Sequence, residues 1–294
     1  MHTSRTLWTL KRFSALAALL LLMLACSLPL GRTTPPAPPE PPAPPAAPAA
    51  PAAPATPTDT AVPPTEAAPV PDISYQGVSF SWEDGVTASA RPETLPAAAG
   101  ADLPPWEQTP EMIQFTLEGY ALSGQFHTPA VRIYPIEAYA QMNEYIPEMV
   151  ANLTAVLNTQ PASPEAIPSL PLWNAGQMMQ AKVRYLNFQN GRGVAFLTQY
   201  GQSFWPINNE SLFYMFQGLT NDGRFWVSAV LPVNHPSLPV NGDAAGITDW
   251  DAFAEGFTNY VASTEEALAA QDDASFTPSL AALNAMLESI QVSR

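Results

Sequence analysis

The sequence has almost no cysteine. Its 294 residues contain a single one, Cys26. One cysteine excludes an intrachain disulfide, a Cys-rich metal site and a CxxC redox pair. Any folded domain in this chain must therefore be stabilised by its hydrophobic core alone.

Basic residues are also scarce, and lysine is the scarcest. Beyond residue 25 the chain has 8 basic residues against 26 acidic ones, a net charge of −18, and Lys182 is the only lysine. A surface of this charge repels phosphates, whereas nucleic-acid binding needs Lys and Arg to neutralise them. We therefore expect no nucleic-acid partner, and we expect a soluble surface that does not lie flat on anionic lipid.

The patterns of common catalytic sites are missing as well. The sequence has no P-loop, no dinucleotide-binding glycine pattern and no HExxH motif. The nearest match to the GxSxG nucleophile elbow, Gly201–Trp205, has Trp where the second glycine belongs. His127 and His235 both lie close to proline, in contexts typical of turns. We predict structural roles for both histidines, and we expect no catalytic residues, no metal site and no cofactor.

What the chain does contain begins with a signal-like amino terminus. The first 12 residues carry three basic side chains, and Phe13–Leu24 is a continuous apolar run. This run is too short for a transmembrane helix, which needs ~20 residues. A charged region followed by a short apolar run predicts a secretory signal over residues 1–25.

The end of this segment carries a more specific pattern. Leu22–Ser27, with the sequence LMLACS, resembles the lipobox of bacterial lipoproteins. The resemblance implies cleavage after Ala25 and a diacylglyceryl thioether on Cys26, which would anchor the chain to a membrane. Met23 stands where leucine is usual, and Ser27 differs from the aspartate of inner-membrane retention signals. The alternative is an ordinary signal peptide that leaves a soluble secreted protein.

A proline-alanine segment follows the lone cysteine. Residues 33–71 contain 16 prolines and 12 alanines. Such a run cannot form a core, and proline favours extended polyproline II conformations. We expect residues 26–71 to be a disordered tether, with a reach of at most ~140 Å at ~3.1 Å per residue.

Residues 72–294 have the patterns of one globular domain. Asn-Gly at 190–191 and Asn-Asp-Gly at 221–223 predict two hairpins, and the strands of the second are apolar on both faces, which predicts a central position in the sheet. Alternating apolar residues predict the other strands. The predicted strands are 72–82, 86–90, 113–117, 131–133, 181–188, 194–200, 212–219 and 225–231.

Three segments have helical periodicity. The first covers 136–158, where Pro147 must kink the helix or begin a second one. The second follows Thr248–Asp251, which resembles a capping box, and the third begins at Pro278. Segregated strands and helices predict an α+β fold with a mainly antiparallel sheet, and strands that are apolar on both faces are compatible with an α-β-α sandwich.

The segment Tyr75–Trp82, with the sequence YQGVSFSW, resembles the first strand of PsbP/Mog1-like domains, which are α-β-α sandwiches. The resemblance covers eight residues and assigns no functional residue. It implies a role as an accessory subunit of a membrane complex.

Tryptophan provides the remaining clue to function. Trp82, Trp226 and Trp250 occupy periodic positions, so we expect them in the core, whereas Trp106 and Trp173 lie in proline-bounded loops.

Another loop combines rings with amides. It places Phe204 and Trp205 close to Asn208 and Asn209, an arrangement suited to stacking on a sugar or a peptide. We take these four as candidate ligand-binding residues. The alternative is that this loop folds back and covers the sheet.

Three functions are compatible with these patterns. The favoured one is a non-catalytic, membrane-anchored extracytoplasmic lipoprotein whose domain binds a protein or glycan of the cell envelope. The second is an envelope glycan hydrolase, which would need two carboxylates at a defined separation in a cleft. The third is the accessory subunit of a membrane complex.

Overall fold

The structure is a computed structural model of the 294-residue chain, and it describes residues 70–100 and 102–294. The predicted signal, Cys26 and the predicted tether up to residue 69 lie outside the described residues. The first strand begins at Ile73, one residue after the predicted start of the domain.

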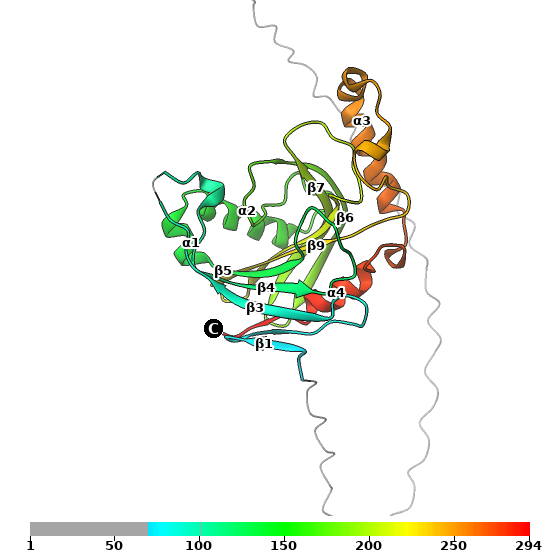
Figure 1. Ribbon diagram of the computed structural model, residues 1–294. Helices are drawn as coiled ribbons and strands as arrows, with labels where there is room; N and C mark the ends of the chain where they lie inside the picture. The colour runs from blue at the N-terminus through cyan, green and yellow to red at the C-terminus, as the bar shows by residue number, and fades with distance from the viewer. Residues whose placement is uncertain (1–69, 101) are drawn as a thin grey trace, which may run out of the picture. The chain divides into compact units, whose positions relative to one another are not determined.

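Seven antiparallel strands form the main sheet, in the order β3-β4-β5-β9-β8-β7-β6 (Figure 1). In chain order they are β3 (Ser89–Leu95), β4 (Met112–Glu118), β5 (Ala130–Pro135), β6 (Gly176–Phe188), β7 (Gly191–Gly201), β8 (Phe213–Thr220) and β9 (Phe225–Pro232). A second sheet joins the two ends of the domain, because β10 pairs with β2. Its strands are β1 (Ile73–Tyr75), β2 (Val78–Phe80) and β10 (Gln291–Val292).

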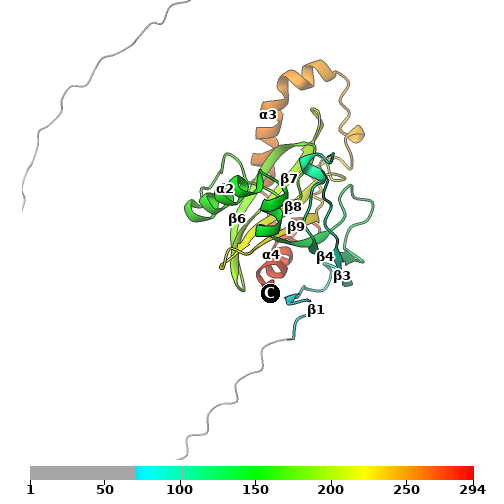
Figure 2. The same cartoon turned by 90° about the vertical axis from the view of Figure 1, so that its left-hand side faces the viewer.

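Within residues 70–100 and 102–294, four α-helices lie around the main sheet. They are α1 (Ile136–Met142), α2 (Ile146–Thr159), α3 (Trp250–Ala269) and α4 (Leu280–Glu288). Helices α1 and α2 lie on one face of the sheet, and α4 lies on the other together with the small sheet (Figures 1 and 2). Helix α3 runs beside the edge strand β6, and its first half extends beyond the strands in both views.

Each face of the main sheet has its own hydrophobic core. Beneath α1 and α2, Leu153 and Leu157 pack with Phe196 and Trp226, whereas beneath α4 the buried residues include Leu283. The central strands are buried on both faces, as the sequence predicted. The α+β fold with a mainly antiparallel sheet is therefore confirmed, and its layers are helix, sheet and helix.

Both predicted hairpins of the main sheet are confirmed. Strands β6 and β7 are joined by Gln189 and Asn190, with Phe188 opposite Gly191. A Cβ atom on Gly191 would overlap the ring of Phe188, so glycine is required for the close approach. Strands β8 and β9 are joined through the turn around Gly223, whose φ is +70°.

The beginning of the domain differs from the prediction. Residues 72–82 form a hairpin of two short strands and not one strand, because Gln76 and Gly77 both have positive φ, which suits a two-residue turn. The predicted strand 86–90 is wrong over its first residues. The strand begins at Ser89 and continues to Leu95, beyond the predicted end at residue 90, and it accommodates Pro92 because β3 is an edge strand.

The observed helices differ in two details from the predicted ones. The predicted helix 136–158 is two helices, and Pro147 lies in the first turn of the second, one of the two predicted outcomes. The predicted capping box is shifted by one residue, because Asp249 is the N-cap of α3 and accepts a hydrogen bond from Ala252 N–H.

Candidate functional site

Helix α3 carries an aromatic stripe that packs against the core only at Tyr260. Trp250, Phe253, Phe257 and Tyr260 follow one another at intervals of three or four residues, so they lie on one side of the helix. Within α3 only Leu268 is fully buried. The prediction that Trp250 belongs to the core is wrong, since 43% of its surface is exposed.

The loop after β7 packs against this stripe. The ring of Trp205 stacks on Trp250 with a centroid distance of 5.3 Å and an interplanar angle of 13°. The ring of Phe204 lies 4.9 Å from that of Phe257. One turn further, Ile207 N–H donates to the hydroxyl of Tyr260 at 2.9 Å. The loop is therefore held to α3 by ring contacts and by one hydrogen bond.

We define the aromatic surface as Phe204, Trp205, Trp250, Phe253 and Phe257. Phe204 is 55% exposed and Trp205 is 37% exposed. Single exposed apolar side chains are common, but a contiguous exposed patch often marks a binding site. This surface is the candidate functional site.

The position of Trp205 depends on a glycine from a third segment. Gly242 is buried, and a Cβ atom at this position would overlap the indole of Trp205. Its φ of −63° is an ordinary value for any residue, so the close approach and not the backbone conformation explains the glycine. Trp205 therefore contacts both Trp250 and Gly242.

An apolar groove of about 470 Å³ adjoins the aromatic surface. Its walls include Met178, Gly201, Phe204 and Phe257. The groove lies where the start of β6, the end of β7 and the loop after β7 meet α3. An apolar side chain of a ligand would be removed from water there, which favours binding.

The candidate residues predicted from the sequence separate into two groups. Phe204 and Trp205 lie on the aromatic surface. Asn208 is fully buried, and its side chain donates to Pro206 O and accepts from Ser211 N–H. The predicted combination of rings and amides therefore does not form one surface.

The side chain of Asn209 also forms hydrogen bonds within the protein. Its side-chain nitrogen donates to the carbonyls of His235 and Leu238 at 3.0 and 3.1 Å, and its Oδ1 accepts from His235 N–H at 2.8 Å. Trp250, Phe253 and Phe257 were not predicted as site residues. Their helical spacing was the available signal, but the same spacing is typical of a buried helix face.

The two histidines lie in different environments. His127 is stacked on Trp173 with a centroid distance of 5.1 Å and lies 4.5 Å from the ring of Phe213. Burial, and secondarily the charge of Arg132, lower the pKa of His127 to about 4. His127 is therefore neutral at pH 7 and contributes to packing.

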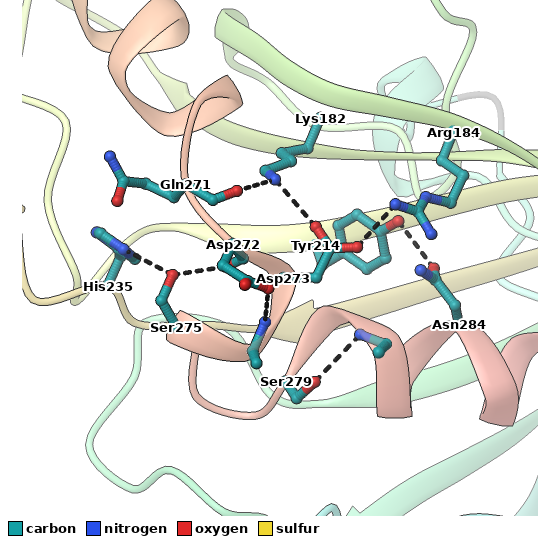
Figure 3. A network of polar contacts seen from close by, with 12 residues as sticks. Lys182, Arg184, Tyr214, His235, Gln271, Asp272, Asp273, Ser275, Ser279 and Asn284 are labelled. Atoms are coloured by element: carbon teal, nitrogen blue, oxygen red, sulfur yellow. Dashed lines mark hydrogen bonds and ion pairs between the residues drawn. The ribbon is translucent and has the colours of Figure 1, made fainter.

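The ring of His235 connects the loop after β9 to the segment between α3 and α4 (Figure 3). Ser237 N–H donates to Nδ1, so the ring proton is on Nε2, and Nε2 donates to Ser275 Oγ at 3.0 Å. Ser275 Oγ in turn donates to Asp272 O at 2.6 Å. A nucleophilic serine would need the imidazole as a proton acceptor, and this tautomer is a donor to it. Burial and the charge of Lys182 lower the pKa of His235, which keeps it neutral.

A polar network connects β6 to the segment between α3 and α4 (Figure 3). Lys182 Nζ donates to Gln271 O and to Asp273 Oδ1, the latter at 2.9 Å, and Arg184 pairs with Asp273 Oδ2 at 2.7 Å. Close by, Tyr214 donates to a buried asparagine of α4. These contacts are internal ones, so we assign the network to stability.

A second, polar groove of about 690 Å³ runs along β6. It is bordered by α3 and by the loop that follows α2, and its lining includes Glu165, Glu265 and Glu266. Glu265 accepts the Gln180 N–H at 2.6 Å and thereby occupies one hydrogen-bonding position at the sheet edge.

Among the described residues, no group of three or more His, Cys, Asp or Glu side chains is arranged to hold a metal ion. No helix within 70–100 and 102–294 has the length and apolarity that crossing a membrane requires. No protein-family profile, curated protein or solved structure matches the chain.

Proposed function

We propose that the chain is a membrane-anchored extracytoplasmic lipoprotein whose domain is a non-catalytic binding module, with the aromatic surface as its ligand-binding site. The location rests on the sequence alone, through the lipobox-like Leu22–Ser27 and the anchor that it implies on Cys26. The binding role rests on one observation: rings from a loop and a helix remain exposed although they are held in fixed positions.

Fixed exposed rings favour binding because little conformational entropy is lost when a ligand covers them. Aromatic side chains also provide large contact areas and are enriched where proteins bind partners. The ligand would be a protein or glycan of the cell envelope, since the proposed anchor restricts the domain to that compartment.

Sedimentation with isolated cell envelopes tests this function. We expect the purified full-length protein to bind envelopes saturably, and we expect Trp205→Ala to weaken binding about tenfold or more, as is usual for a central aromatic residue of an interface. The matched control is Trp106→Ala, because Trp106 is also exposed, at 41%, but lies in a separate short helix (Pro105–Glu107). Equal binding by both variants and the wild type would refute the proposal.

The polar groove supports glycan hydrolysis as a second candidate function. Glu165 and Glu266 line this groove together and are exposed, so they form a candidate carboxylate pair. Release of reducing ends from purified cell wall, abolished by Glu266→Gln but retained by Trp205→Ala, would favour the hydrolase. The accessory-subunit role stays a prediction that rests on Tyr75–Trp82.

A further inference from the structure

The aromatic surface lies in a region with only negative charge. Asp249 and Asp251 flank Trp250 in the chain, and Asp243 follows Gly242, whose backbone contacts Trp205. These three exposed aspartates are called the acidic rim. The sequence has no Lys or Arg between Arg224 and Arg294.

This charge restricts the class of ligand. Anionic lipid and nucleic acid are repelled, and residues 72–294 contain 7 basic residues against 23 acidic ones. A second copy of the chain would bring an equal negative rim, and like charges in an interface are unfavourable. A neutral sugar would gain little from the net charge, and the amides of Asn208 and Asn209 that could have bound its hydroxyls are used internally.

The indoles of the aromatic surface and the acidic rim both favour a positively charged ligand. Lys and Arg are attracted to the face of an indole within ~6 Å of its centre, and they pair with carboxylates. The surface offers the indoles of Trp205 and Trp250 beside the acidic rim. The adjoining groove of about 470 Å³ is apolar, so it suits an uncharged side chain. The complete site therefore suits a ligand that carries both positive charges and an uncharged apolar side chain.

We infer that the aromatic surface binds a basic segment of a polypeptide. An aromatic or aliphatic side chain of that segment enters the groove beside Phe204 and Phe257, and neighbouring Lys or Arg side chains contact the two indoles and the acidic rim. This inference rests on the proposed function and adds the chemical class of the partner.

The test uses the full lipidated chain in phosphatidylcholine nanodiscs, whose lipid carries no net charge. Three probes are compared by calorimetry: a peptide with Lys residues around a central Phe, the same peptide with Gln in place of Lys, and a neutral disaccharide fragment of the cell wall. Labelling with fluorotryptophan reports where each probe binds, with Trp205→Phe and Trp250→Phe assigning the two ¹⁹F resonances.

We expect the Lys peptide to shift both resonances and to bind about tenfold more tightly than the Gln peptide, since several weak charge contacts add to that factor. Its affinity should fall with added salt because the contacts are exposed. The combined substitution Asp243→Asn, Asp249→Asn and Asp251→Asn should weaken binding about tenfold. Asn is also a good N-cap, so position 249 still caps α3.

The matched control removes equal charge from the opposite face of the sheet. Glu137→Gln, Glu144→Gln and Glu148→Gln, all exposed around α1 and α2, should leave the affinity unchanged. Equal binding of the Lys and Gln peptides, or preferential binding of the disaccharide at Trp205, would refute the basic-segment inference and leave the proposed function intact.

Two further outcomes would also overturn the inference. If none of the probes moved the two resonances, the partner class would be wrong, and envelope sedimentation would decide separately whether the surface binds at all. If the protein alone doubled its mass in light scattering, and Trp205→Ala abolished the doubling, the occupant would be a second copy of the chain.

Discussion

At the residue scale, Lys182 combines an unfavourable backbone conformation with favourable side-chain contacts. It lies at an irregularity of β6 with a φ of +54°, where most side chains are strained. Its ammonium group contacts Gln271 O, Asp273 and the ring of Phe276, whose centroid is 5.9 Å away. The lysine thus connects the edge of the sheet to the segment after α3.

Two substitutions separate the strain from the contacts. Lys182→Met removes the ammonium group and keeps the strain, so we expect the free energy of unfolding to fall by about 2 kcal/mol. Lys182→Gly removes both, and we expect it to be more stable than the Met variant by about 0.5–1 kcal/mol. Urea unfolding measures both values. A Gly variant less stable than the Met variant would contradict this account.

The neutral state of His127 makes stability depend on pH. Its pKa is about 4 in the folded protein and about 6.5 in the unfolded chain, so the unfolded state binds more protons between these values. The stabilising contribution is complete above pH 6.5 and is lost as the pH falls toward 4.

We expect this histidine to lower the free energy of unfolding by about 1–2 kcal/mol between pH 7 and pH 5. In His127→Phe, which keeps a stacked ring, this part of the pH dependence of the free energy of unfolding should disappear. The contribution of His235 should remain. Urea unfolding at the two pH values measures the difference. An unchanged pH dependence of the free energy of unfolding in this variant would show that His127 does not titrate as described.

Residue roles were only partly predictable from the sequence. The proline contexts of His127 and His235 indicated positions in loops, and both histidines lie outside helices and strands, because proline acts on its immediate neighbours. The amide of Asn209 could not be assigned, since its partners lie 26 and 29 residues further along the chain. Whether a polar side chain is free for a ligand depends on such long-range contacts.

At the element scale, elements fixed by local contacts were predicted best. The hairpins β6–β7 and β8–β9 follow from turn residues and strand patterns. The hairpin β1–β2 was missed because its turn uses Gln76, a residue that seldom adopts positive φ. The surroundings of α3 were missed for another reason. An aromatic stripe specifies one face of a helix, but whether a sheet or only a loop covers that face depends on the tertiary arrangement.

Two Gly→Ala substitutions test the description of α3 and its loop. Gly256 is exposed inside α3, and nothing lies within 4 Å of a Cβ atom built there, so Gly256→Ala should stabilise the protein by about 0.5–1 kcal/mol through helix propensity. Gly242→Ala should destabilise it, because the new methyl group overlaps Trp205.

Thermal unfolding and the ¹⁹F resonance of Trp205 report both effects. We expect Gly242→Ala to shift that resonance and to weaken envelope binding, whereas Gly256→Ala should change neither. An unshifted resonance in Gly242→Ala would show that the glycine does not position Trp205.

At the scale of the whole molecule, stability and proposed function lie in different parts of the domain. The two cores and the polar network around Lys182 hold the sheet and its covering helices together. The aromatic surface lies on α3 and the loop after β7, which contribute less to those cores. Substitutions on the surface should therefore affect binding more than folding.

The central claim concerning the whole chain is that Cys26 carries the membrane anchor, and intact-mass spectrometry of the protein purified from cell membranes tests it most directly. The account predicts a mature chain that begins at Cys26 with a diacylglyceryl group on its sulfur, and it predicts that Cys26→Ala abolishes this form and moves the protein out of the membrane fraction. A Cys26 thiol without lipid, or a native protein that is found free in the culture medium, would contradict it.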